Sequence, residues 1–178
     1  MDLYFKETME FKPEVVVVML GGWDLDEAMK NPDIYKTRVV EVVDRLTFDG
    51  ARLIWLGMPP TPPDEKLEIA RKSINQIYEE VSDTRSDVRF VSTDQVLGDS
   101  EGKFKRILMG VEGEFSNVRK IRNGKPDGHL CPAGAALIGD LVYREIRNHF
   151  SLPERTEDWW EGEWTNDRRY DDPPGSCL

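Results

Sequence analysis

The sequence predicts an α/β fold built on a parallel β-sheet, and three observations support this. Short apolar runs without polar alternation occur early in the chain, as expected of strands covered on both faces. Segments with helical periodicity separate these runs. The 178 residues are 39% hydrophobic and 33% charged, values ordinary for one soluble globular domain. Strands alternating with such helices favour right-handed βαβ units and a three-layer sandwich.

Three segments are predicted to form the strands. Residues 15–20 read Val-Val-Val-Val-Met-Leu and are followed by two glycines. Residues 52–57 repeat the apolar pattern and end at Met-Pro-Pro, where the prolines stop the strand. Residues 88–92 form a third, shorter candidate. Helices are predicted for the segments with one apolar face, which are residues 33–48, 63–82 and 132–150.

The remaining segments indicate how the domain is organised. Residues 97–126 are rich in glycine and charge and lack a clear period, so we expect an irregular excursion near the rim of an active site. Residues 151–178 contain three of the five tryptophans among many acidic residues. Because exposed tryptophans are a liability, we expect this tail to pack on the domain formed by residues 1–150.

The composition excludes several functions. The formal charge is −10, from 34 acidic and 24 basic residues, which disfavours a nucleic acid partner. No apolar run approaches the roughly 18 residues that a membrane-spanning helix needs. The first residues carry no recognisable targeting segment. The two cysteines, Cys131 and Cys177, are too few for a four-thiolate zinc site, and they form either one disulfide or two independent thiols.

A pair of glycines marks the first candidate for a functional element. Gly21 and Gly22 follow the first predicted strand, and ligands of parallel sheets bind beyond the carboxyl ends of the strands. Glycines there let backbone N–H groups approach a substrate oxygen. Taken alone, the pair is also typical of a simple turn after a strand.

The second candidate is the stretch Asp127-Gly128-His129, just before the last predicted helix. A histidine in this place can act as general base for a serine hydroxyl, and a neighbouring carboxylate can hold the ring in its reactive tautomer. Taken alone, Asp-x-His is more often a loop pair or a helix-start feature.

Together these stretches resemble the SGNH hydrolase (GDSL-like) superfamily, and more narrowly the SGNH domains of actinobacterial cell-envelope acyltransferases. The resemblance rests on Gly21 to Asp24 as the third sequence block of that superfamily and on Asp127 to His129 as the fifth. It implies a flavodoxin-like α/β sandwich and a serine esterase or O-acyltransferase. The ester-linked acyl substrate would belong to an envelope glycan or lipid.

The resemblance also implies the roles of single residues. His129 would be the general base, Asp127 its orienting carboxylate, and Gly21 and Gly22 the backbone donors of the oxyanion hole. It implies no metal and no organic cofactor. A disulfide between Cys131 and Cys177 would fasten the tail beside the histidine and imply an extracytoplasmic, oxidising location.

Three departures from the family pattern bear on this interpretation. The nucleophile block Gly-Asp-Ser is absent upstream of Gly21, so we expect an N-terminally truncated domain that is inactive as it stands. Trp23 replaces the asparagine of the oxyanion hole. Asp127 and His129 are separated by one residue instead of two, which leaves their contact open. Truncation would leave strand 15–20 as an open edge, where a second copy could form a homodimer; any membrane association would need upstream segments.

The triplet Gly98-Asp99-Ser100 spells the nucleophile motif at another place. It follows the third predicted strand instead of the first, and its composition is that of an ordinary turn. We therefore predict a surface turn. If Ser100 were the nucleophile, the chain would be a rearranged, self-sufficient enzyme.

Two other functions remain open. The domain could be a non-catalytic module that binds an envelope glycan or a partner protein, with Asp127 and His129 in structural roles. A nucleotide-binding flavodoxin-like domain is a weaker alternative, because no glycine-rich phosphate loop follows the first strand.

Overall fold

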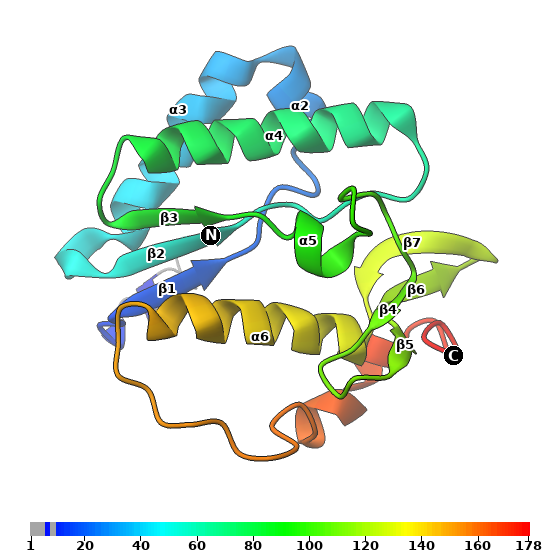
Figure 1. Cartoon of the computed structure of the whole chain (residues 1–178). Coiled ribbons are helices and arrows are strands. Elements are labelled where there is room, and N and C mark those ends of the chain that lie inside the picture. The colour runs from blue at the N-terminus through cyan, green and yellow to red at the C-terminus, as the bar shows by residue number, and fades with distance from the viewer. Residues whose placement is uncertain (1–5, 8–9) are drawn as a thin grey trace. The chain divides into compact units, whose positions relative to one another are not determined.

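The computed structural model describes residues 6–7 and 10–178, and the chain forms two compact units (Figure 1). The first unit comprises residues 1–58 and 65–92, and the second comprises residues 59–64 and 93–178. Each unit is described by itself below. The predicted division into a domain of residues 1–150 and a tail of residues 151–178 stays a prediction.

The first unit contains the predicted parallel sheet. Its strands follow one another in the order β1 (Val15–Val18), β2 (Arg52–Leu56) and β3 (Val88–Val91), and both pairings are parallel. All three predicted strands are thus confirmed, although β1 ends two residues earlier than expected. The predicted α/β class with a parallel sheet is confirmed, and the third layer of the sandwich stays a prediction.

Helices connect these strands and lie on one face of the sheet (Figure 1). They are α2 (Leu25–Lys30), α3 (Pro32–Leu46) and α4 (Glu65–Asp83), with a short 3-10 turn η1 (Phe48–Gly50) before β2. The apolar periodicity of the sequence describes their packing well. Buried residues of α3 and α4 recur every three or four positions, so each helix presents one face to the core.

The strands of this sheet differ in how far they are buried. The central strand β2 is buried at four of its five positions. In β1 only Val16 is buried, and Val17 is 40% exposed. Among the described residues β1 pairs with β2 alone and forms one end of the sheet, as the sequence led us to expect. An apolar strand at an open edge can accept a further strand.

The second unit contains elements that the sequence did not predict. The stretch 97–126 was expected to be irregular. It begins with the last residue of the short helix α5 and includes most of two antiparallel hairpins. These elements are α5 (Asp94–Leu97), β4 (Ile107–Met109), β5 (Phe115–Asn117), β6 (Arg119–Arg122) and β7 (Lys125–Leu130). The expectation was wrong here, because β4, β5 and β6 have only three or four residues, too few to establish an alternating pattern.

The last helix and the segment after it complete this unit. Helix α6 (Pro132–Arg147) begins at the predicted proline, and two 3-10 turns follow, η2 (Glu163–Asn166) and η3 (Arg168–Asp171). The disulfide between Cys131 and Cys177 is present and joins the residue before α6 to the end of the chain. No helix in the described ranges is long and apolar enough to cross a membrane.

The tail also packs through its aromatic and polar groups. The ring of Trp159 lies so close to Gly139 of α6 that a Cβ there would be 3.3 Å from it. The Arg155 guanidinium lies 4.8 Å from the Trp159 ring centroid. The buried Lys120 ammonium donates hydrogen bonds to the carbonyls of Arg169 and Asp172. These contacts and the disulfide tie the tail to α6 and β6.

Candidate active site

The predicted base and its carboxylate lie together in strand β7. The sequence places Asp127 and His129 just before the last helix, and the structure shows that both belong to β7. Alternate residues of a strand point to the same face, so a separation of one residue brings the two side chains side by side. The His129 backbone N–H donates to Asp127 Oδ1 over 2.7 Å, and His129 Nδ1 contacts the same oxygen. The contact that the short spacing left open is therefore present.

The two side chains differ strongly in exposure. The side chain of Asp127 is 12% exposed, whereas that of His129 is 65% exposed. Arg122 adds a third group, with its Nε 3.0 Å from Asp127 Oδ2. Burial acts to raise the pKa of Asp127. The hydrogen bonds from His129, its charge when the ring is protonated, and the positive charge of Arg122 outweigh burial, so that the pKa of Asp127 lies below its usual value.

This arrangement has a defined chemical capacity. An ionised Asp127 accepts a hydrogen bond from Nδ1–H of His129, which leaves Nε2 of the neutral ring as the proton acceptor. The exposed ring can reach a substrate or a nucleophile, while the partly buried carboxylate is held by His129 and Arg122. The pair thus has the form of a base with its orienting carboxylate, and their catalytic roles stay a prediction.

The backbone around this pair is held by a hairpin turn that the sequence analysis missed. Asn123 and Gly124 both have positive φ angles, 52° and 69°, as a type I′ turn between two strands requires. The buried Arg119 of β6 donates from Nη1 to the carbonyl of Gly128, the residue between Asp127 and His129, over 2.5 Å. Asn-Gly is the strongest short hairpin signal in a sequence, so this turn and the position of Arg122 could have been predicted.

The diglycine bend, defined as Gly21 and Gly22, follows β1 in the first unit. Gly21 is buried with a φ of 120°, a conformation that side-chain-bearing residues rarely adopt. A Cβ on Gly21 would lie 2.2 Å from the hydroxyl oxygen of Tyr78, whereas a Cβ on exposed Gly22 would lie 3.5 Å from Met58 Cε. Gly21 is therefore required by a close approach of α4. The oxyanion role of both glycines stays a prediction.

Beneath this bend lies a chain of hydroxyl contacts, which the sequence did not reveal. The Tyr78 hydroxyl lies 3.1 Å from the Leu20 carbonyl and 2.7 Å from the Tyr35 hydroxyl. The Tyr35 hydroxyl lies 3.3 Å from Asp24 Oδ2. The Tyr78 ring packs on the Trp55 ring with 4.6 Å between centroids. The bend is thus supported from α3, α4 and β2.

Ser100 lies exposed in a tight turn of the second unit. The Asp99 carboxylate accepts hydrogen bonds from the backbone N–H groups of Glu101 and Lys103, each over 2.9 Å. The Asp99 N–H donates to the Lys103 carbonyl. These bonds are those of an aspartate that stabilises a turn, as expected for this triplet. A role of Ser100 as nucleophile stays a prediction.

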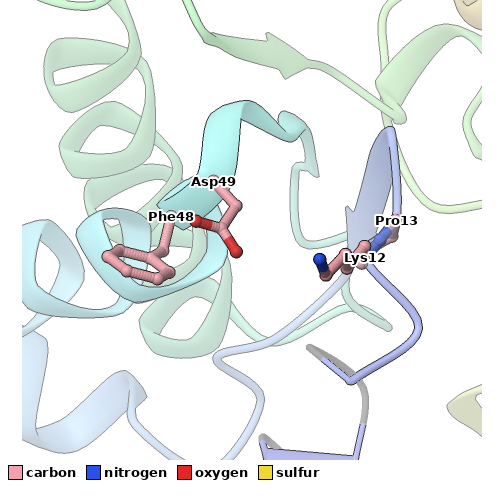
Figure 2. Close-up of a pocket in the computed structure, with 4 residues that line it drawn as sticks. All are labelled: Lys12, Pro13, Phe48 and Asp49. Atoms are coloured by element: carbon pink, nitrogen blue, oxygen red, sulfur yellow. The ribbon is translucent and has the colours of Figure 1, made fainter.

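A pocket of about 300 Å³ lies elsewhere in the first unit and contains none of the predicted site residues. Lys12, Pro13, Phe48 and Asp49 line it, and the charged ends of Lys12 and Asp49 point toward one another (Figure 2). These residues precede β1 and β2, so the pocket lies at the amino ends of the strands. Ligands of parallel sheets bind at the opposite, carboxyl end, where the diglycine bend lies.

Within the described ranges, no cluster of three or more His, Cys, Asp or Glu side chains could hold a metal ion.

Comparison with known proteins places the chain in a family. A family model described as "Protein of unknown function (DUF459)" matches residues 4–145. The chain belongs to the DUF459 family. No curated protein matches the sequence of this DUF459 member.

A solved structure similar to this chain illustrates the fold. It is a candidate platelet activating factor from Streptococcus pneumonia, with a TM-score of 0.53 and 16% sequence identity. The similarity covers 75% of the DUF459 chain and 59% of that structure, so the chain spans less than two thirds of that protein. At this identity the similarity establishes the α/β fold alone.

Proposed function

We propose that this DUF459 chain is the carboxy-terminal part of an SGNH-type (GDSL-like) serine esterase or O-acyltransferase domain. The contact between Asp127 and His129 carries the proposal, because it joins a partly buried carboxylate to an exposed imidazole. The similarity in fold to a candidate platelet activating factor supports the proposal. We infer that the nucleophilic serine comes from an upstream segment of the natural protein.

The proposed reaction is acyl transfer through that serine. The serine oxygen attacks the ester carbonyl while His129 accepts the hydroxyl proton at Nε2. The N–H groups of Gly21 and Gly22 stabilise the negative oxygen of the tetrahedral intermediate. The leaving alkoxide takes the proton from His129, and the acyl-serine forms. Water or a sugar hydroxyl then attacks the acyl group, its proton passing to His129 and back to the serine.

The substrate class and location follow as parts of the proposal. The substrate is an ester-linked acyl group on an envelope glycan or lipid, and no cofactor or nucleic acid is involved. The disulfide supports an oxidising, extracytoplasmic compartment. The open edge of β1 supports pairing with an upstream strand or with a second copy of the chain.

The test is hydrolysis of p-nitrophenyl acetate by the protein encoded in the whole natural reading frame. We expect His129→Ala to lower kcat by about 10³-fold or more, and Asp127→Asn by about 10²–10⁴-fold, as in other serine triads. The chain as described here should show no turnover. Turnover by this chain that disappears in Ser100→Ala would instead make Ser100 the nucleophile. A whole protein whose turnover survives His129→Ala would refute the proposal.

A non-catalytic binding module is the second candidate, and one observation favours it. Trp23, in place of the oxyanion-hole asparagine, is 100% exposed directly beside the diglycine bend. Exposed tryptophans are enriched where proteins bind partners. The discriminating result would be a whole protein that hydrolyses no ester but binds envelope glycan, with binding lost in Trp23→Ala and retained in Trp164→Ala.

A further inference from the structure

The hydroxyl chain under the diglycine bend contains more contacts than protons. Its three contacts run from the Leu20 carbonyl to Tyr78, from Tyr78 to Tyr35, and from Tyr35 to the Asp24 carboxylate. Each tyrosine hydroxyl can donate one hydrogen bond, and a carbonyl or carboxylate can only accept. Two protons therefore serve three contacts.

Both tyrosines keep their protons at neutral pH. Burial raises the pKa of Tyr35 to about 12, and the nearby carboxylates of Asp24 and Glu27 act in the same direction. Burial also raises the pKa of Tyr78 well above its usual value, and its hydrogen bond with Tyr35 adds to this. The count of one proton for each hydroxyl therefore holds.

Two arrangements of hydrogen bonds place a proton in the 2.7 Å contact between the hydroxyls, which without a proton would bring the lone pairs of the two oxygens together. In the first, Tyr35 donates to Tyr78 and Tyr78 donates to the Leu20 carbonyl. In the second, Tyr78 donates to Tyr35 and Tyr35 donates to Asp24. Both include the 2.7 Å contact between the hydroxyls, and they differ in the 3.1 Å contact to Leu20 or the 3.3 Å contact to Asp24. The shorter distance favours the arrangement that holds Leu20.

The Leu20 carbonyl matters because it shares a peptide group with the N–H of Gly21. In a trans peptide the carbonyl oxygen and the amide hydrogen point in opposite directions within one plane. When Tyr78 on α4 holds the carbonyl, the Gly21 N–H must therefore point away from that hydroxyl. Gly21 cannot carry a side chain in this position, because its Cβ would overlap Tyr78.

We propose that Tyr78 is a positioning residue that orients the Gly21 N–H as an oxyanion donor. Tyr35 competes with the Leu20 carbonyl for the Tyr78 proton, and Asp24 favours Tyr35 in this competition by accepting the Tyr35 proton in a hydrogen bond. This inference rests on the proposed acyl-transfer function. The inference assigns Tyr35 and Tyr78 a function in the reaction in addition to core packing. It also predicts that the two tyrosines differ in their effect on the reaction, although both are buried and each contributes one hydroxyl.

The experiment compares hydroxyl deletions in the whole natural protein, with p-nitrophenyl acetate as substrate. Tyr78→Phe frees the Leu20 carbonyl, so kcat should fall by about 10-fold or more, since loss of one oxyanion donor costs about 10²–10³-fold. KM should change by less than about twofold, because the donor acts mainly in the transition state. Tyr35→Phe leaves Tyr78 with Leu20 as its acceptor, so kcat should stay within about twofold of the wild type.

Two further variants complete the set. Asp24→Asn supplies an amide that donates to Tyr35, which provides a third proton for three contacts, and kcat should be equal to or above the wild type. Tyr143→Phe is the matched control, because the Tyr143 hydroxyl also donates to a backbone carbonyl, that of Pro153, in the other compact unit. It should leave kcat unchanged.

The outcomes separate this inference from the proposed function. The proposed function is refuted if the wild-type protein shows no turnover, or if the His129→Ala variant turns over the substrate as fast as the wild type. Turnover that needs His129 but is equal in Tyr78→Phe and wild type refutes the positioning role. The role is also refuted if Tyr35→Phe loses as much kcat as Tyr78→Phe, because equal losses indicate packing alone. If Tyr78→Phe does not fold, a tenfold loss in Tyr35→Phe decides against the inference, and an unchanged kcat there supports it.

A measurement on the present chain needs no activity. The amide resonance of Gly21 reports on the peptide group that Tyr78 holds. We expect its hydrogen exchange to accelerate in Tyr78→Phe and to stay unchanged in Tyr35→Phe and Tyr143→Phe. Equal exchange in all three variants would overturn the positioning role even if the protein proves to be an esterase.

Discussion

The diglycine bend and the Asp127–His129 pair are held in place in opposite ways. The bend depends on partners far along the chain, since Tyr78 lies 58 residues after Leu20. The pair in β7 depends on close neighbours: Asp127 contacts His129 two residues later and Arg122 five residues earlier. Local spacing in the sequence therefore determines the pair, whereas folding of the first unit determines the bend.

The two regions also differ in burial. Tyr78 is 2% exposed beneath the bend, while the His129 side chain is 65% exposed. Substitutions at the bend should therefore reduce the free energy of unfolding. Substitutions of the pair should change its chemistry with little effect on stability. The four predictions that follow test this contrast.

The largest effect should come from the disulfide beside the pair. Replacing Cys131 and Cys177 by serine opens a link across 46 residues, and the free energy of unfolding should fall by about 3–4 kcal/mol. Urea denaturation of the oxidised wild type and the double variant measures it. If the contact between Asp127 and His129 depends only on close neighbours in the chain, the NMR signals of the His129 ring should stay unchanged in the folded variant. A large change in those signals would show that the pair needs the distant tail.

A methyl group at the bend should have the next largest effect. Gly21→Ala places a Cβ against the Tyr78 hydroxyl at a positive φ, so we expect a loss of about 2–3 kcal/mol in unfolding free energy. Gly22→Ala is the matched control, because its Cβ makes an ordinary contact, and it should stay within about 0.5 kcal/mol of the wild type. Equal losses in the two variants would contradict the close approach of Tyr78.

The hairpin turn that positions β7 should show a smaller effect. Gly124 has a φ of 69° with open space around its Cα, so Gly124→Ala adds backbone strain without a steric clash. We expect a loss of about 1 kcal/mol in thermal or urea unfolding. In the whole protein, kcat should change little if β7 keeps its register. A loss of kcat greater than tenfold would mean that the turn itself positions the pair.

The smallest effect concerns the pH dependence that Asp127 confers. Its folded pKa lies below the usual value, so its stabilisation is present above the carboxyl's unfolded pKa of about 4 and is lost as pH falls through the folded pKa. Asp127→Asn should therefore be less stable than the wild type at pH 7, by less than about 1 kcal/mol, and the gap should close near pH 2. Urea denaturation at both pH values measures this difference in unfolding free energy. A difference that widens in acid would contradict the lowered pKa of Asp127.

The accuracy of the sequence predictions follows the range of the interactions behind them. The strands of the first unit and all three long helices were predictable, because short apolar runs mark the strands and apolar residues at helical spacing mark the helices. The hairpins between residues 98 and 130 were missed, although Asn123-Gly124 signals one of them. Three of their four strands have only three or four residues, too few for a periodic pattern. The buried Arg119 and Lys120 also contradict the expectation that charged residues are exposed.

By itself, the sequence determined the α/β class, the order of strands and helices, and the proximity of Asp127 and His129 along the chain. These properties depend on local periodicity and on spacing, both of which can be read without coordinates. Only the tertiary structure decided that Tyr78 reaches the carbonyl before Gly21 and that Arg119 of β6 holds the backbone between Asp127 and His129. Such contacts join separate elements, and their geometry exists only once the elements have packed.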